Sequence, residues 1–516
     1  MLKIEPLLWP VPPATFRTHR RPPVEREPTG WDRLRRIASV AFCSLLCTAC
    51  AVGPNYVKPA SPTTAVSFVG AEPSIYSTQE IQPQFWRQFD DPLLDRLIDE
   101  ALAANHDLRI AVATLKQARA VHRESKFDLF PTVTAEAGYT HQQYPPSQSF
   151  GSGHTLDQSY YDAGFDAYWE LDLWGRVRRG VEASRAEVQG AEANLRDAQV
   201  SVTAEVARTY FELRGQQNEL DVAQRNVANQ QATLRLTTSQ LEAGRGTELD
   251  TSRQQAQLST TLGSIAPLQA AIERSIHRLS VLTGREPTAL RSLLAPPHEL
   301  PPLPQITTVG DPAGLLRRRP DIRVAERALA ADTARIGVAV GDLFPKVTFN
   351  GNLGYAASAP SLLGTSGTRT FLIGPGISWA AFDLGRVQAR IAGARAQTEG
   401  ALAGYEQTVL RALEETENAL TDHARARDRL AHMSDAATAS RTAAQIAHAR
   451  YEGGMVGFLE VLDAERTQLA AEDALAQSRT ETATSLIAVY KALGGGWEGI
   501  PPPRLTQAAA PEPPER

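Results

Sequence analysis

Three cysteines are the residues whose type and spacing could do chemistry on their own. Cys43, Cys47 and Cys50 form a CxxxCxxC pattern, and the rest of the chain contains no cysteine. This spacing occurs in some iron–sulfur enzymes, whose ligands are thiolates held in a folded loop. Here the cysteines lie in or directly after an apolar run, 37–49, that follows three arginines. We therefore reject a cluster site, and the chain beyond Cys50 can have no disulfide or thiol chemistry.

The same segment has the layout of a secretory signal. Its apolar run is too short for a transmembrane helix, which needs about 20 residues, and the small residues Thr48 and Ala49 end it. A cysteine directly after such a cleavage site is typical of a bacterial lipobox, although Cys47 stands where that motif usually has leucine. We expect 1–49 to be a signal peptide and Cys50 to carry a covalent lipid. The alternative is simple secretion with cleavage nearby.

Composition narrows the class of protein. The chain has 516 residues, 42% hydrophobic and 22% charged, which excludes a mostly disordered chain and a polytopic helical membrane protein. Without residues 1–49, 45 basic and 54 acidic residues remain, so neither nucleic acid nor another anionic partner is expected. The ten histidines show no metal-ligand spacing, and no glycine-rich phosphate loop follows a strand. We expect no enzyme activity, no metal and no cofactor apart from the lipid on Cys50.

The chain repeats itself, which indicates a tandem duplication. Asp128-Leu-Phe-Pro131 recurs 214 residues later as Asp342-Leu-Phe-Pro345, and Gly175-Arg-Val177 recurs 210 residues later as Gly385-Arg-Val387. Asp-Pro pairs open both copies, each suited to a helix N-cap followed by proline at the first helical position. The expected units are a lipid-anchored segment 50–90, repeat 1 at 91–310, repeat 2 at 311–497 and a disordered tail 498–516.

Each repeat is expected to contain two strands, a long helix and a return helix. The strand segments are about 131–172 and 345–382, the long helices about 176–241 and 386–451, and the return helices about 247–282 and 456–494. The strands alternate apolar and polar residues over about ten positions, as transmembrane β-strands do. A half-buried strand of a soluble sandwich would alternate equally well. If the strands span a membrane, four are too few to close a barrel, since about eight is the minimum, so several protomers must contribute.

The long helices carry a heptad pattern. Val206, Leu213, Leu220, Val227, Leu234 and Leu241 recur every seven residues, which predicts a coiled-coil seam. Sixty-six residues give a helix of about 99 Å. Such rods exceed a globular core and suit helices packed side by side in the wall of a tube.

These features resemble the TolC-like outer-membrane efflux family, most closely its lipoprotein branch. The segments that carry the resemblance are Cys50-Ala-Val-Gly-Pro-Asn-Tyr56, Phe85-Trp86 with Asp91-Pro-Leu-Leu94, Arg318-Arg-Pro-Asp321, Asp342-Leu-Phe-Pro345 and Phe382-Asp-Leu-Gly-Arg386. The resemblance implies a mainly α-helical homotrimer with a shared twelve-stranded barrel in the outer membrane above a periplasmic tunnel. It implies a passive exit duct, supplied by an inner-membrane pump through a periplasmic adaptor. An outer-membrane conduit for protein secretion and a secreted coiled-coil scaffold are the alternatives.

The resemblance also implies sites. An acidic ring at the periplasmic tip maps to Glu460 and Asp463, for which a solvated helix face is the alternative. Tyr451 matches a position that helps hold the tip closed, while the basic partner of that latch is Val456 here. Gly244, Gly246, Gly453 and Gly454 are expected to stop the helices, because glycine can take the left-handed conformation. Together with Gly457 they are expected to form the hairpin turns and to shape the adaptor-binding surface. Four aromatic residues are expected on the lipid-facing side of the barrel: Phe165, Trp169, Phe349 and Trp379.

Overall fold

The computed structural model describes residues 51–60, 67–79, 82–145, 147, 155–498 and 500. The chain divides into two units, 1–50 and 51–516, and every described residue belongs to the second. The predicted signal peptide, the lipid site at Cys50 and nearly all of the predicted tail therefore lie outside the described residues.

Four strands form one antiparallel sheet. They are β2 (Thr132–Tyr144), β3 (Leu156–Leu171), β5 (Lys346–Ala357) and β6 (Arg369–Ser378), in the order β2-β3-β5-β6. Each repeat thus supplies one β-hairpin, and the β3–β5 pairing joins the two. A minimal parallel pair, β1 (Tyr76–Ser77) with β4 (Thr307–Thr308), lies elsewhere in the chain.

The helices follow the same order in both repeats. In the first, α2 (Pro92–Ala104) and α3 (His106–Phe127) precede the hairpin, and α4 (Arg176–Glu242) and α5 (Glu248–Leu282) follow it. In the second, α7 (Pro312–Arg318) and α8 (Pro320–Gly341) precede it, and α9 (Leu384–Glu452) and α10 (Phe458–Ala492) follow. A short helix, α6 (Arg291–Leu294), and a 3-10 turn, η1 (Phe85–Phe89), complete the main elements.

The expected helix starts are present in both copies. Asp91 accepts hydrogen bonds from the amides of Leu93 and Leu94 at the start of α2. Asp311 accepts one from the amide of Gly314 at the start of α7. In both helices proline occupies the first position, where its missing N–H costs nothing. These caps confirm that the Asp-Pro pairs mark equivalent helix starts.

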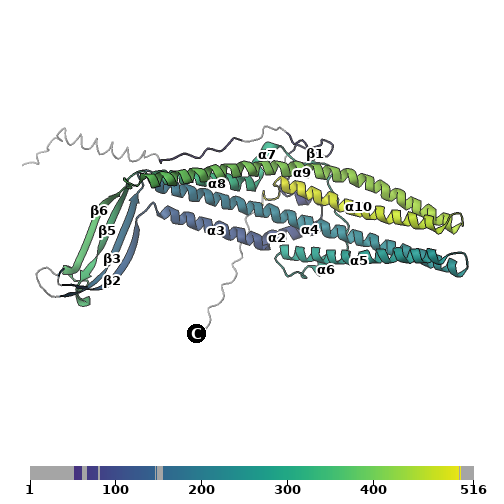
Figure 1. Cartoon of the computed structure of the whole chain (residues 1–516), viewed down its shortest axis with the longest axis horizontal. Coiled ribbons are helices and arrows are strands. Elements are labelled where there is room, and N and C mark those ends of the chain that lie inside the picture. The colour runs from purple at the N-terminus through teal and green to yellow at the C-terminus, as the bar shows by residue number, and fades with distance from the viewer. Residues whose placement is uncertain are drawn as a thin grey trace, which may run out of the picture. The chain divides into compact units, whose positions relative to one another are not determined.

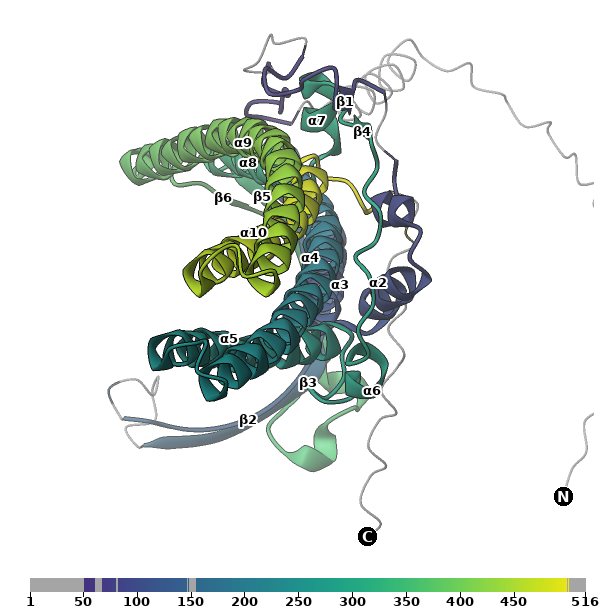
Figure 2. The ribbon, with the colours of Figure 1, turned by 90° about the vertical axis from the view of Figure 1, so that its right-hand side faces the viewer.

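The long helices α4 and α9 have 67 and 69 residues, each about 100 Å of helix. The sheet lies at one end of these helices and the α4–α5 and α9–α10 turns lie at the other (Figure 1). Seen along their length, the helices stand side by side in a curved row (Figure 2). This confirms a mainly helical fold with two β-hairpins and two long antiparallel helical hairpins. None of the described helices combines the length and the apolar content that a membrane crossing requires.

The largest hydrophobic cluster lies at mid-length of the helices, and we call it the central core. It joins η1 and α2 to α4 and to the last turns of α5 and α10. Tyr490 of α10 stacks on Phe85, with ring centroids 4.6 Å apart. Phe211 of α4 meets Phe89 edge-on at 4.9 Å. These rings are fully buried, so the central core fixes both repeats to each other.

Candidate functional site

The two hairpin turns have the same backbone. Gly244 and Gly454 take left-handed φ values of 66° and 72°. In the first turn the amides of Gly244 and Arg245 donate to the carbonyls of Leu241 and Gln240. In the second, the amides of Gly454 and Met455 donate to the carbonyls of Tyr451 and Arg450. Both patterns are Schellman motifs, which end a helix with one left-handed residue.

Gly246 and Gly453 do not take the left-handed conformation. A Schellman motif needs the reversed conformation at a single residue, so the neighbouring glycines keep negative φ, as Gly453 does at −75°. Gly246 has a different reason to be small, because a Cβ there would lie 3.0 Å from the amide nitrogen of Leu241. Gly457 has extended backbone at the start of α10, with φ of −78°.

The two return helices begin differently. Thr247 forms a capping box with Asp250 at the start of α5, with reciprocal side-chain-to-amide bonds of 3.3 Å. Gly457 offers α10 no side-chain cap. Instead, Phe458, Val461 and Leu462 are buried in a small cluster at this end of α10. The first turn is thus held by polar capping, and the second by apolar packing.

Tyr451 joins the two hairpins at the tip. Its hydroxyl donates to Oε1 of Gln240 on α4, and its ring lies 5.7 Å from that of Phe458. Burial raises the pKa of the Tyr451 phenol above its ordinary value, so the hydroxyl stays a donor. The partner Gln240 was not predicted, because nothing in its sequence context distinguishes it from other polar positions of α4.

Glu460 and Asp463 lie close to the second turn. Both are exposed in the first turns of α10, and their i, i+3 spacing puts them on one helix face. Neither makes an ion pair within the described ranges. No group of three side chains that could hold a metal ion occurs among the described residues. A ring of carboxylates would require further copies of the chain.

The sheet has one apolar and one polar face. Phe165 lies opposite Ala135 and Leu353, and Phe349 lies opposite Trp169 and Pro375. Because paired residues share a face, Phe165, Trp169 and Phe349 lie on one side of the sheet, where Phe165 is 60% exposed. Trp379 directly follows β6 and is 54% exposed. The opposite face carries polar residues, among them Asp162, Asp166, Asn350 and Asn352. There Asn352 donates to Asp166 at 2.8 Å.

Trp169 and Trp379 also tie the sheet to the helices. The indole N–H of Trp169 donates to the carbonyl of Leu129 at 3.0 Å, and that of Trp379 donates to the carbonyl of Leu343 at 2.9 Å. Leu129 and Leu343 directly follow the C-caps of α3 and α8. The same bond therefore occurs once in each repeat. These residues have a structural role in addition to the predicted membrane-facing one.

A buried arginine holds the segment that follows Cys50. Arg179 of α4 is 4% exposed and donates to the carbonyl of Val52 at 3.1 Å and to Asn55 at 2.7 Å. Gly53, with φ of 89°, passes so close to Gly337 of α8 that a Cβ would lie 2.4 Å from the Gly337 Cα. The amide of Val52 donates to the carbonyl of Trp174, next to the end of β3. The start of the segment is thereby fixed near the base of the sheet.

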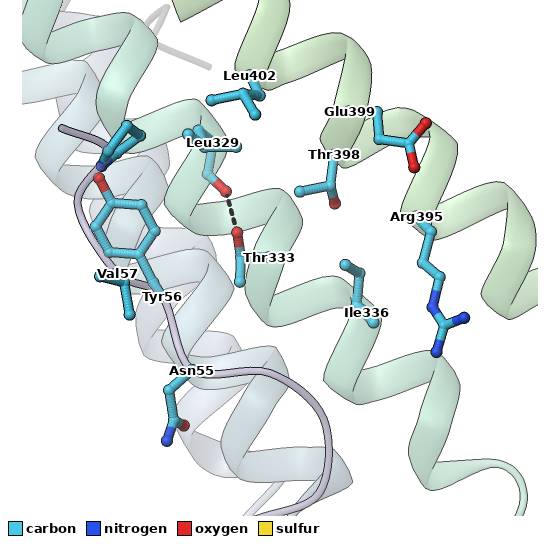
Figure 3. Close-up of a pocket in the computed structure, with 11 residues that line it drawn as sticks. Asn55, Tyr56, Val57, Leu329, Thr333, Ile336, Arg395, Thr398, Glu399 and Leu402 are labelled. Carbon is cyan, nitrogen blue, oxygen red and sulfur yellow. Dashed lines mark hydrogen bonds between the residues drawn. The ribbon is translucent and has the colours of Figure 1, made fainter. Parts of the chain in front are cut away.

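Farther along, this segment borders a cavity of about 500 Å³ (Figure 3). Tyr56 and Val57 form one wall, and Leu329 and Ile336 of α8 and Leu402 of α9 form the others. The Tyr56 hydroxyl donates to Glu326 of α8 at 3.1 Å. The cavity is mainly apolar, with Arg395 and Glu399 of α9 among its lining residues.

A polar seam that was not predicted lies between the hairpins. From residue 226 to the end of α4 the buried residues are Asn226, Gln230, Thr233 and Thr237. Leu220, Val227, Leu234 and Leu241 of the predicted heptad line are only half-buried. Glu465 and Glu472 of α10 are buried opposite the polar set. The 4-3-4 spacing of these polar residues could have indicated that they share a buried helix face. A heptad count that scores only apolar residues overlooks this pattern.

Comparison with known proteins identifies the family. A model of the family "Outer membrane efflux protein" matches residues 97–285 and 312–495. Toluene efflux pump outer membrane protein TtgC of Pseudomonas putida is 31% identical over 470 residues, 90% of this chain and 96% of that protein. Outer membrane protein OprJ of Pseudomonas aeruginosa is 31% identical over 468 residues, 89% of this chain and 96% of that protein. The solved outer-membrane channel OprN has a TM-score of 0.82 and 44% identity, covering 87% of this chain and 100% of that one. The chain therefore belongs to the outer membrane efflux protein family and is an outer-membrane exit channel for efflux.

Proposed function

We propose that three copies of this chain form one duct, which carries small molecules outward after an inner-membrane pump and a periplasmic adaptor deliver them. The main support for this proposal is the four-stranded sheet, whose outer strands β2 and β6 have no second partner strand among the described residues. Unpaired backbone groups are costly in lipid. Three copies would pair every edge in a twelve-stranded barrel, with the apolar face toward lipid and the polar face toward the lumen.

The nature of the cargo is supported by the relatives. The names of several refer to toluene, solvent or antibiotic efflux pumps, which favours small molecules over secreted proteins as cargo. A secreted coiled-coil scaffold would have no use for an exposed apolar sheet face. The adaptor would contact the hairpin turns, whose backbone shape is set by Gly244, Gly246, Gly453, Gly454 and Gly457.

A lipid on Cys50 is part of the proposal. The hydrogen bonds from Arg179 to Val52 and Asn55, which we call the Arg179 clamp, hold residues 51–55 near the base of the sheet. A lipid on Cys50 would then lie close to the membrane surface. Mass spectrometry of the mature N-terminus tests this, and Cys50→Ser should abolish the modification. An unmodified cysteine, or cleavage at another residue, would refute the lipid anchor and leave the duct untouched.

The decisive experiment for the duct changes the apolar sheet face. Phe165→Asp should reduce the trimer fraction in native mass spectrometry, because an acid facing lipid costs about 1–4 kcal/mol depending on depth. Phe165→Leu keeps an apolar side chain and is the matched control. A detergent-solubilised monomer that retains its full β content in the unchanged protein would contradict the proposed barrel.

A further inference from the structure

Two buried carboxylates of α10 face a polar cleft between the hairpins. Glu465 and Glu472 lie seven residues apart and border a cavity of about 890 Å³ lined by α4, α9 and α10. Their side chains are 7% and 10% exposed. A buried carboxylate is tolerated only with charged or hydrogen-bonding partners, so the partners of each decide how firmly the hairpins are held together.

Glu465 of α10 has partners on three other helices, α4, α5 and α9. His448 Nε2 of α9 lies 2.9 Å from its Oε1. The Thr233 hydroxyl of α4 donates to the same oxygen at 2.6 Å, and Gln254 of α5 donates to Oε2 at 3.5 Å. This one carboxylate therefore links both hairpins, and of these three partners His448 alone can carry a charge.

Glu472 provides an internal comparison. Arg441 of α9 contacts it at 2.8 Å, and Gln468 and Asn226 donate to it at 3.1 and 3.5 Å. A guanidinium stays protonated at every accessible pH. The Glu472 contact is therefore permanently charge-compensated, whereas the compensation of Glu465 depends on a group that titrates near neutrality.

We propose that Glu465, which bonds across to the α4–α5 hairpin and is charge-compensated by His448 of its own hairpin, acts with His448 as a pH-sensitive lock near the tip. Protonated His448 compensates the buried carboxylate and favours closely packed hairpins. When His448 loses its proton, Glu465 keeps only neutral donors, and its burial becomes unfavourable. The hairpins then separate more readily at the cleft.

The surroundings of His448 fix the direction of the response. Its hydrogen bond to Glu465 raises the pKa of His448 above the ordinary imidazole value, and Glu452 on α9 acts in the same direction. Glu472 also faces the cleft from α10. The cations that line it are Arg441, paired with Glu472, and Arg225 of α4, paired with Asp221 at 3.1 Å; Gln254 of α5 is neutral.

A raised histidine pKa stabilises the folded arrangement below the ordinary value of about 6.5, and this contribution is lost as the pH rises through the raised value. The lock is therefore closed in mild acid and loosens in mild alkali. This direction depends only on the contacts within one chain. Its consequence for conduction, a wider tip at alkaline pH, rests on the proposed function.

The test measures hairpin separation directly. Spin labels at Arg245→Cys and Met455→Cys, both exposed turn positions, report tip-to-tip distances by pulsed electron paramagnetic resonance in the full-chain protein. Single-label samples identify pairs between subunits. The measurement runs from about pH 6, below the ordinary imidazole pKa of about 6.5, to about pH 8.5, well above it. Over this range the fraction of wider distances should rise several-fold.

Two variants and a control make the test specific. His448→Gln keeps a neutral donor and should remove the pH response, while His448→Arg should keep the narrow distance throughout. His432→Gln changes an exposed histidine of the same helix and should behave like the unchanged protein. A pH response that persists in His448→Gln, or none in the unchanged protein, would overturn the lock. If distances respond while bilayer conductance does not, the lock stands and the assignment of the tip to conduction fails.

Discussion

The α4–α10 interface has two halves of opposite character. In the central core it is built from Val206, Tyr210, Leu486 and Tyr490, which are fully buried. Toward the tip the buried residues become Asn226, Gln230, Thr233, Glu465 and Glu472. Apolar burial is strong and needs no partner geometry, whereas a polar seam is stable only while its hydrogen bonds hold. One continuous pair of helices thus combines a permanent joint with a section that can open.

Shortening a buried side chain in the central half of this interface should have the largest effect on stability. Leu486→Ala should destabilise the protein by about 2–5 kcal/mol, because it removes buried methyl groups and leaves a cavity. The matched change in the tip half is Thr237→Ala, which removes a hydroxyl that donates to the carbonyl of Leu234 in its own helix. That change should cost about 1 kcal/mol or less. Thermal unfolding followed by helical circular dichroism compares them, and equal losses would contradict the division.

The two halves should also respond to pH in opposite directions. His423 lies between α9 and α10 beside the central half, 1% exposed, and its Nδ1 is 3.0 Å from the Ser485 hydroxyl. Burial, with Arg427 nearby, lowers the pKa of His423 to about 4. The unfolded chain therefore binds more protons than the folded one between about pH 6.5 and that value, and stability falls as the pH drops through this window.

The free energy of unfolding should fall by about 3 kcal/mol per chain in acid, because the pKa of His423 is about 4 in the folded chain and about 6.5 in the unfolded one. Unfolding temperatures measured from about pH 7 to about pH 4 test this. His423→Gln should flatten the acid limb, while His432→Gln should leave it unchanged. An identical acid limb in all three proteins would show that His423 is not its source.

Changes to the helix caps at the two turns should have smaller effects on stability than the changes above. Thr247→Ala should destabilise the first hairpin by about 1 kcal/mol, because the capping box with Asp250 is lost. Gly457→Ser should stabilise the second by a few tenths of a kcal/mol, about 0.3, by supplying the missing cap. Hydrogen exchange of the first turns of α5 and α10 measures both locally. Faster exchange in α10 of the serine variant would contradict the capping argument.

The sequence predicted the elements more completely than the contacts between them. Period-2 strands, Asp-Pro helix starts and glycine stops are local signals, so the strands, the long helices and the left-handed Gly244 and Gly454 were expected. The Tyr451–Gln240 bond and the Arg179 clamp join residues far apart in the chain, and no local pattern indicates them. The polar seam was not predicted for another reason. A heptad count scores only apolar residues, whereas burial depends on which face of the helix the neighbouring hairpin covers.

The smallest effect on stability is expected at the tip acids, where the effect on function should be clearest. Glu460 and Asp463 are exposed, so replacing both by alanine should change stability by no more than about 0.5 kcal/mol. In a trimer, six such carboxylates would surround one axis and attract cations. Single-channel recordings in planar bilayers should then show weaker cation selectivity and weaker block by polyvalent cations in the double variant. The neutral change Thr467→Ala on the same helix is a suitable control, since it removes an exposed hydroxyl that donates to the carbonyl of Asp463. Unaltered selectivity and block would assign both acids to a solvated helix face, leaving the His448–Glu465 pair as the pH-responsive element proposed for the tip half.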